Sequence, residues 1–199
     1  MSRLPEDYFS ASRPSVVEHA EFSPEERALL LQLAKDSIAS AIEKREISLT
    51  PPSSHLAEPR GVFTTLYTLG ELRGCVGFIT PVASLYRAVA ETAQAAAFED
   101  TRFPSLTREE LPKIEVSLSI LSPLLAIHPE EIEVGRHGLM ISLAGRRGLL
   151  LPQVARERGW DRITFLEQTC HKAGLPMNAW QNSASIEAFT AEVFGDNKL

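Results

Sequence analysis

Residues 71–81 read ELRGCVGFITP, and this stretch decides the predicted fold because it is a strand with a different chemistry on each face. Strand side chains alternate with a period of two. Leu72, Gly74 and Val76 therefore face one side, whereas Arg73 and Cys75 face the other. The sequence predicts that the first side packs on a hydrophobic core and that the second carries a candidate site.

The candidate site on the second face combines a cation, a thiol and a glycine. Arg73 lies two residues before Cys75, and a nearby cation lowers the pKa of a thiol. Gly77 leaves space on the other side of Cys75, and glycine inside a strand often marks a close approach. A structural alternative is equally concrete, because free cysteine is among the most buried residue types and glycines also serve packing. The local sequence leaves both interpretations open.

The composition is that of an ordinary globular domain. The chain has 199 residues, of which 44% are hydrophobic and 23% are charged. Its net charge of −6 lacks the basic footprint of a nucleic-acid-binding protein. Two cysteines do not make a disulfide framework, which favours a reducing cytoplasm. Neither a secretory signal nor a membrane-spanning apolar run is recognisable, so we expect a cytoplasmic protein.

Helix caps and strand alternation predict the order of elements. Residues 1–21 are expected to form a flexible arm, followed by a helix over residues 23–44 that opens on a Ser23–Glu26 capping box. Residues 48–60 form a loop, and residues 61–69 and 71–79 form a hairpin. A helix capped at Thr80-Pro81 runs to about residue 97. The remaining predicted elements are strands over residues 114–121, 139–143, 147–151 and 185–194, and helices over residues 152–159 and 161–174.

This order of elements repeats within the chain. A hairpin, an Arg-Gly pair in its second strand, helical sequence and a further strand occur over residues 61–121 and again over residues 137–194. The predicted fold is therefore α+β, with two β3α2-like repeats in one domain over residues 22–195. Their strands are expected to form a single curled, barrel-like, mostly antiparallel sheet with helices packed outside.

Several sequence blocks resemble the AMMECR family. They are LRGCVG at 72–77, GVFTTL at 61–66, FEDTRFPSLT at 98–107, GRHGL at 135–139, LLLPQVA at 149–155 and WDRITFLEQTCHKAGLP at 160–176. The resemblance implies a barrel-like sheet built from two β3α2 repeats, in agreement with the repeat above. Its bacterial and archaeal branch, AmmeMemoRadiSam protein A, implies a Memo-like protein and a radical SAM protein as partners. Thr101 stands where many relatives have proline.

The resemblance directs attention to residues in these blocks. The candidate catalytic residues are Cys75 as nucleophile and His137, which would approach Cys75 as a base if the repeats pack pseudo-symmetrically. His137 has the alternative of a hydrogen-bonded histidine in a glycine-flanked turn. The candidate ligand-binding residues are Arg73, Gly74, Gly77, Asp100, Arg102 and Gln153. For Asp100 and Arg102, the alternative is a turn in which the two charges satisfy each other.

Two functions of different classes follow from these residues. In the first, the chain is a binding or delivery module whose pocket around Arg73 and Cys75 holds an anionic small molecule or a peptide for partner proteins. In the second, it is an enzyme that uses Cys75, with His137 or a carboxylate as base. No metal-ligand or nucleotide motif is present, so no cofactor is expected. Cys170 falls on a core stripe, and Cys75 is expected to be alkylated faster than Cys170.

Overall fold

The computed structural model describes residues 20–196, and within them the strands form two separate antiparallel sheets. The first compact unit comprises the described parts of Met1–Leu121 and Glu192–Leu199, and the second comprises Ser122–Ala191. The predicted α+β class is confirmed. The single curled, barrel-like sheet is wrong, because neither four-stranded sheet closes and each has its own hydrophobic core. The expected arm lies outside the described residues, except for residues 20 and 21.

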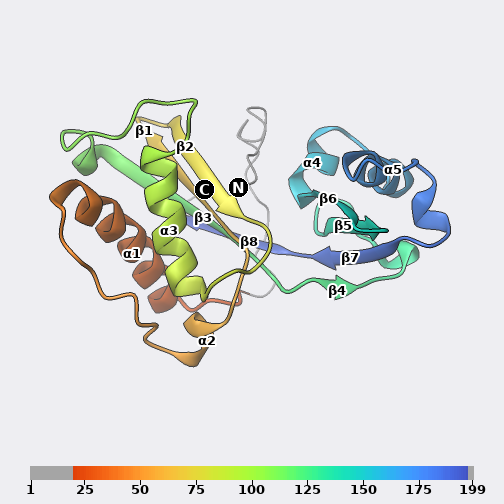
Figure 1. Cartoon of the computed structure of the whole chain (residues 1–199), viewed down its shortest axis with the longest axis horizontal. Helices are drawn as coiled ribbons and strands as arrows, with labels where there is room; N and C mark the ends of the chain where they lie inside the picture. Colours follow the sequence, from red (N-terminus) through yellow and green to blue (C-terminus); the bar gives the residue numbers. More distant parts are fainter. Residues whose placement is uncertain (1–19, 197–199) are drawn as a thin grey trace. The chain divides into compact units, whose positions relative to one another are not determined.

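The first unit is a four-stranded sheet with helices on one face (Figure 1). Its strand order is β2-β1-β3-β8, with bounds β1 Val62–Thr68, β2 Glu71–Phe78, β3 Ile114–Leu121 and β8 Ala191–Gly195. The helices are α1 Pro24–Glu43, α2 Ser54–Ala57 and α3 Leu85–Phe98, and a short 3-10 turn, Leu111–Lys113, precedes β3. The predicted hairpin and the strand over residues 114–121 are confirmed.

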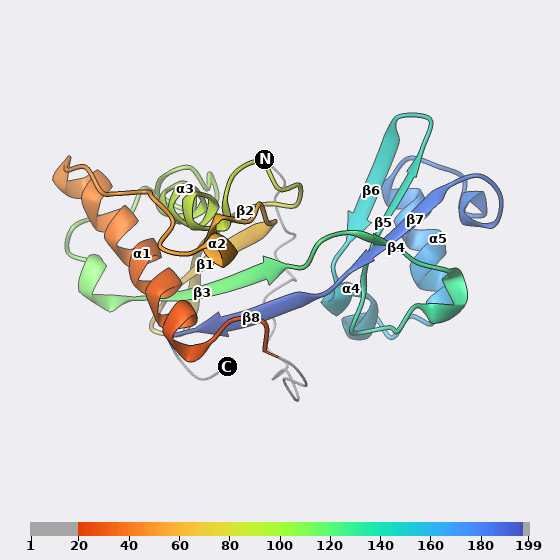
Figure 2. The ribbon, with the colours of Figure 1, turned by 90° about the horizontal axis from the view of Figure 1, so that it is seen from below.

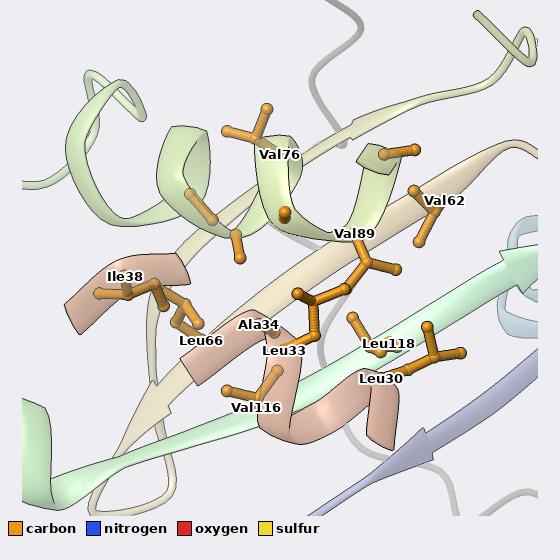
Figure 3. Packing of buried hydrophobic residues seen from close by; sticks show 14 of the residues in the cluster. Leu30, Leu33, Ala34, Ile38, Val62, Leu66, Val76, Val89, Val116 and Leu118 are labelled. Atoms are coloured by element: carbon orange, nitrogen blue, oxygen red, sulfur yellow. The ribbon is translucent and has the colours of Figure 1, made fainter. Parts of the chain in front are cut away.

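The core of the first unit lies between the helices and one face of the sheet. Figure 3 shows Leu33 and Val89 from the helices directed at strand residues that include Leu66 and Leu118. Leu66 and Leu118 have no exposed surface. Burying an aliphatic side chain of this size stabilises the folded state by about 1.5–3 kcal/mol. The alternation that predicted a core face on β2 is correct for Val76, which belongs to this core.

The helix termini of the first unit agree with the predictions only in part. α1 begins as expected, with Ser23 accepting the Glu26 N–H and the Glu26 side chain accepting the Ser23 N–H. α3 begins one turn later than predicted, because Ser84 rather than Thr80 is its N-cap. The backbone N–H of Leu85 bonds the carbonyl of Glu58, which fixes the helix start at this point. Val82, which would belong to the helix predicted from Thr80-Pro81, instead lies before the helix start and is 66% exposed.

The second unit repeats this architecture with a smaller sheet. Its strand order is β4-β7-β5-β6, with bounds β4 Leu125–Ala126, β5 Gly138–Leu143, β6 Arg146–Leu150 and β7 Ser185–Phe189. Helices α4 Pro152–Glu157 and α5 Arg162–Lys172 follow β6, and short 3-10 turns cover Pro129–Glu131 and Ala179–Gln181. Ile141, Phe165 and Leu166 are fully buried in its core. The helix predicted over residues 161–174 is confirmed as α5, with Asp161 as its N-cap.

Both hairpins turn through a two-residue loop with left-handed backbone. The loops are Leu69-Gly70, with φ of 54° and 81°, and Ala144-Gly145, with φ of 50° and 80°. Two successive residues with positive φ are typical of the type I′ turn, whose twist matches that of the flanking strands. The final predicted strand, residues 185–194, breaks at Thr190 into β7 and β8, which belong to different sheets. The repeat of local elements is therefore real, but the two copies do not share one sheet.

The described helices include none that is both long enough and apolar enough to cross a bilayer.

Candidate functional site

Cys75 lies on β2 with its side chain on the face opposite the helical core. It pairs with Thr65 of β1, whose hydroxyl donates a hydrogen bond to the sulfur over 3.3 Å. The residue is only 1% exposed. Burial raises the pKa of the Cys75 thiol to about 11, although the Thr65 hydrogen bond and the charge of Arg102 oppose this change. At neutral pH the group is therefore a protonated thiol, which argues against the thiolate activation expected from Arg73.

Asp100 joins the loop after α3 to the edge of β2. Its carboxylate accepts the backbone N–H of Cys75 over 2.9 Å. The same carboxylate accepts a fork from Arg102, with the Nε bond at 3.0 Å and the Nη2 bond at 2.7 Å. Burial alone would raise the pKa of Asp100, but the bonds from Arg102 and Cys75 outweigh it and hold the pKa below its usual range. The self-satisfied turn, one of the two interpretations of this segment, is thus present.

Arg73 makes a second two-pronged ion pair beside the first. Its Nε and Nη2 atoms lie 2.8 and 3.2 Å from the two carboxylate oxygens of Glu110. Glu110 also accepts the N–H of Thr107 over 2.8 Å. The hydrogen bond from Arg73, followed by that from Thr107, lowers the pKa of Glu110 to about 2. Residues 100–110 are therefore tied to β2 at Cys75 and again at Arg73.

The two glycines of LRGCVG are required by close packing. A Cβ at Gly74 would overlap the backbone carbonyl of Ala96 in α3. A Cβ at Gly77 would overlap the ring of Phe63 on β1. Neither glycine borders an open space for a ligand in this structure, and their place as ligand-binding residues stays a prediction.

Two further candidates, His137 and Gln153, belong to the second unit. The Nδ1 atom of His137 accepts the N–H of Glu133 over 3.1 Å, so the residue is bonded within its turn. Burial lowers the pKa of His137, assisted by Arg136 and opposed by Glu133. Gln153 lies in α4, and its buried Oε1 has no hydrogen-bond partner among the described residues. Because Cys75 belongs to the first unit, its pairing with His137 stays a prediction.

Sequence reasoning missed two residues that define the surroundings of Cys75. Thr65 is its cross-strand neighbour, and Glu110 is the partner of Arg73. The hairpin register around Gly70 provides the signal for Thr65. Glu110 lies 37 residues beyond Arg73 in the sequence, and nothing local indicates that its carboxylate reaches β2. Within residues 20–196, no three His, Cys, Asp or Glu side chains gather closely enough to hold a metal ion.

Comparison with known proteins identifies the family. The AMMECR1 family model matches residues 31–194, which include the whole Cys75 site. The chain belongs to the AMMECR1 family. Protein MK0488 from Methanopyrus kandleri is 41% identical over 186 residues, which cover 87% of this chain and 90% of that protein. A protein from Aquifex aeolicus is 38% identical over 179 residues, which cover 85% of this chain and 92% of that protein.

A solved structure shares the AMMECR1 fold. The crystal structure of the uncharacterized protein PH0010 from Pyrococcus horikoshii matches with a TM-score of 0.68 and 38% sequence identity. The match covers 85% of this chain and 90% of that chain. Neither this structure nor the two relatives carries an activity in its name. The function of this AMMECR1 chain must therefore be argued from its own site.

Proposed function

We propose that this chain is a partner-binding module rather than an enzyme with a cysteine nucleophile. The observation that carries the proposal is the internal pairing around Cys75. The thiol is buried and protonated, Arg102 is paired with Asp100, and Arg73 is paired with Glu110. A nucleophile requires an accessible thiolate, and a site for a free anion requires an uncommitted cation. A fixed surface for a protein partner requires neither.

The segment over residues 100–110 supplies suitable contact groups. Arg102 lies over the ring of Phe103, with 5.5 Å from its guanidinium carbon to the ring centroid. The Glu110 side chain is 28% exposed, and both of its carboxylate oxygens accept hydrogen bonds from Arg73 or Thr107, which fix its position. Arginine and aromatic side chains that are held in place before binding are frequent hot spots of protein interfaces. The hydrogen bond from Cys75 to Asp100 and the ion pair of Arg73 with Glu110 would hold this surface in one conformation against β2.

The partners in this proposal are a Memo-like protein and a radical SAM protein. They follow from the resemblance of LRGCVG and the accompanying blocks to AmmeMemoRadiSam protein A. A location in the reducing cytoplasm belongs to the same proposal and is supported by two cysteines that are both free.

The test is titration of the full chain with the Memo-like and radical SAM proteins of the same genome, by isothermal calorimetry. Phe103→Ala and Glu110→Gln are expected to weaken binding about tenfold or more, or about 1.4 kcal/mol. Arg87→Ala is the matched control, because Arg87 is an exposed arginine that pairs with Glu91 on α3. Wild-type affinity in both site variants would refute the proposed surface, and absence of binding to either protein would refute the partners.

Alkylation of the thiols separates the module from the enzyme. With iodoacetamide at neutral pH, Cys75 and Cys170 should both stay unmodified in the native protein and react only after denaturation. Both are buried, and burial raises the pKa of each thiol. Mass spectrometry of tryptic peptides reports each site separately. Rapid native modification of Cys75 alone would favour the enzyme alternative.

A further inference from the structure

Within residues 20–196, strand β6 is an edge of the second sheet with an unpaired outer side. The sheet order is β4-β7-β5-β6, so β5 is the one described strand that pairs with β6 (Figure 2). Exposed edges present free N–H and C=O groups to which another strand can be added. Proteins often protect such edges with charged residues, and β6 begins with the exposed residues Arg146 and Arg147.

The hairpin turn determines which backbone groups of β6 are free. In a two-residue type I′ hairpin, the residues that flank the turn form a hydrogen-bonded pair, and the pairs then alternate. Leu143 and Arg146 flank the Ala144-Gly145 turn, and Ile141 pairs with Gly148. The N–H and C=O groups of Arg147 and Leu149 therefore point away from β5. Among the described residues, no hydrogen bond to these outward groups is formed.

The first unit shows how the equivalent edge is completed. Gly74 and Gly148 are equivalent, because each lies under the end of a helix, at Ala96 and Ala173 respectively. Cys75, the residue after the first glycine, has an outward N–H that donates to the carboxylate of Asp100. Leu149 is the residue after the second glycine. The same position on the repeat is thus occupied by a carboxylate in one unit and by no described group in the other.

The basic side chains around Leu149 favour a carboxylate at this position too. Arg147 is exposed on the outer strand, and Arg146 is held by a hydrogen bond from its Nη1 atom to the carbonyl of Gly174 over 2.8 Å. His171 and Lys172 lie in the last turn of α5, which packs on β6 at Gly148. Within the part of the chain that the structure describes, neither Arg146 nor Arg147 enters an ion pair with an acidic side chain. In a chain of net charge −6, this is an uncompensated basic edge.

We infer that the outer edge of β6 is a docking site for an acidic, extended segment of a partner protein. The backbone of the segment pairs with the outward N–H and C=O groups of Arg147, and beyond this pairing one of its carboxylates, in place of a backbone carbonyl, accepts the Leu149 N–H as Asp100 accepts that of Cys75. Arg147 then pairs with the carboxylate as Arg102 pairs with Asp100. This site lies in the second unit, so its failure would leave the proposed surface at residues 100–110 untouched, and the reverse also holds.

The test uses a short peptide of alternating threonine and valine with a central Asp-Thr-Asp segment, added to the 15N-labelled full chain. The amide signals of Arg147 and Leu149 should shift, and their hydrogen exchange should slow at saturation, because both groups gain a partner. The twin peptide with Asn-Thr-Asn should bind about tenfold more weakly or worse, since charge-assisted bonds are about twice as strong. Equal affinity of the Asp-Thr-Asp and Asn-Thr-Asn peptides would overturn the inference, and so would unchanged amide signals of Arg147 and Leu149.

Variants of β6 test the contact from the protein side. Leu149→Pro removes the donor at an edge position where proline is tolerated, and Leu149→Ala retains it as the matched control. Leu149→Pro should lose binding of the Asp-Thr-Asp peptide, and Leu149→Ala should keep it. Arg147→Gln should lower affinity, whereas Arg156→Gln, an exposed arginine on α4, should not. If Leu149→Pro fails to fold, the test rests on the comparison of Arg147→Gln with Arg156→Gln. Equal affinity of these two variants for the Asp-Thr-Asp peptide would overturn the inference.

Discussion

At the scale of single residues, His55 contributes a contact that depends on pH. It lies in α2, and its Nδ1 atom is 2.8 Å from a carboxylate oxygen of Glu26. Its ring stacks on Phe22 with 4.8 Å between centroids, and its Nε2 atom lies 3.6 Å from Glu21. The hydrogen bond to Glu26 raises the pKa of His55, although burial opposes it. The protonated imidazole thus joins α2 to the start of α1.

The first prediction is a pH-dependent contribution of His55 to stability. Because its folded-state pKa is raised, the stabilisation is fully present below the unfolded value of about 6.5 and is lost as pH rises through the folded pKa. His55→Asn should lower the free energy of unfolding by on the order of 1 kcal/mol at the acidic end, since the pair is partly exposed. The difference from wild type should shrink above the folded pKa.

Denaturant titrations across this pH range measure the effect, and NMR titration of the imidazole locates its folded pKa. His128, an exposed histidine in the second unit, provides the control variant His128→Asn. A His55→Asn difference that stays constant with pH would contradict the linkage.

The sequence anticipates part of this residue-level detail and misses the rest. The Ser23–Glu26 capping box was predicted correctly because both partners lie within one turn. The use of the same Glu26 by His55 was not, because a proline-rich loop does not indicate which helix end it folds against. The same limit explains Cys75. Arg73 lies only two residues from Cys75 in the sequence, but it does not activate the thiol, because Cys75 is buried and Arg73 pairs with the Glu110 carboxylate from far along the chain.

At the scale of elements, the Arg-Gly pair on the second strand of each hairpin allows a helix to approach. A Cβ at Gly74 would meet the backbone of α3, and a Cβ at Gly148 would meet the backbone around Ala173. The second prediction is that Gly74→Ala and Gly148→Ala each lower the free energy of unfolding by about 1–3 kcal/mol. Backbone atoms cannot rotate away, so each helix must shift.

Urea unfolding monitored by circular dichroism measures both glycine variants. Val82→Ala is the control, because Val82 is 66% exposed and surface substitutions usually stay within about 0.5 kcal/mol. Wild-type stability of either glycine variant would show that the helix approach is not as close as described.

The elements themselves were largely predictable, but their pairing was not. Period-two alternation and turn residues placed the hairpins correctly because these signals are local. Alternation states which side chains share a face, but it does not state which strands are neighbours. Residues 185–194 keep their alternation through Thr190, so the sequence gives no sign that β7 and β8 enter different sheets. The single-sheet prediction failed at this point.

At the scale of the whole molecule, the chain supplies the first sheet with a strand, β8, from outside that sheet's own run of sequence, whereas the second sheet is built from one continuous run. β3 belongs to the first sheet and is followed by β4 of the second, whereas β7 belongs to the second and is followed by β8 of the first (Figure 2). The first sheet is therefore incomplete until β8 is available. The family match covers residues 31–194, which include the second unit, most of the described part of the first unit and both connections.

The last prediction tests this dependence of the first unit on β8. Phe194 is 8% exposed, lies 6.3 Å from Phe22 between ring centroids, and carries the guanidinium of Arg27 at 5.6 Å. Asp196 accepts the N–H of Val116 in β3 over 2.7 Å. Phe194→Ala should lower the free energy of unfolding by about 3–5 kcal/mol, because a buried aromatic side chain is lost.

Hydrogen exchange measures the protection of the Val116 amide, and thermal unfolding measures the stability of each variant. The Val116 amide should exchange faster in Phe194→Ala and in Asp196→Ala, although both substitutions are remote from it in sequence. Met177→Ala, a 44% exposed residue of the second unit, should leave this amide and the melting temperature unchanged. If the Val116 amide keeps its protection in Phe194→Ala, β8 is an appended strand and the first unit is stable without it. If protection is lost, the first unit needs residues that are synthesised only after the second unit, so its folding cannot be completed before β8 has been synthesised.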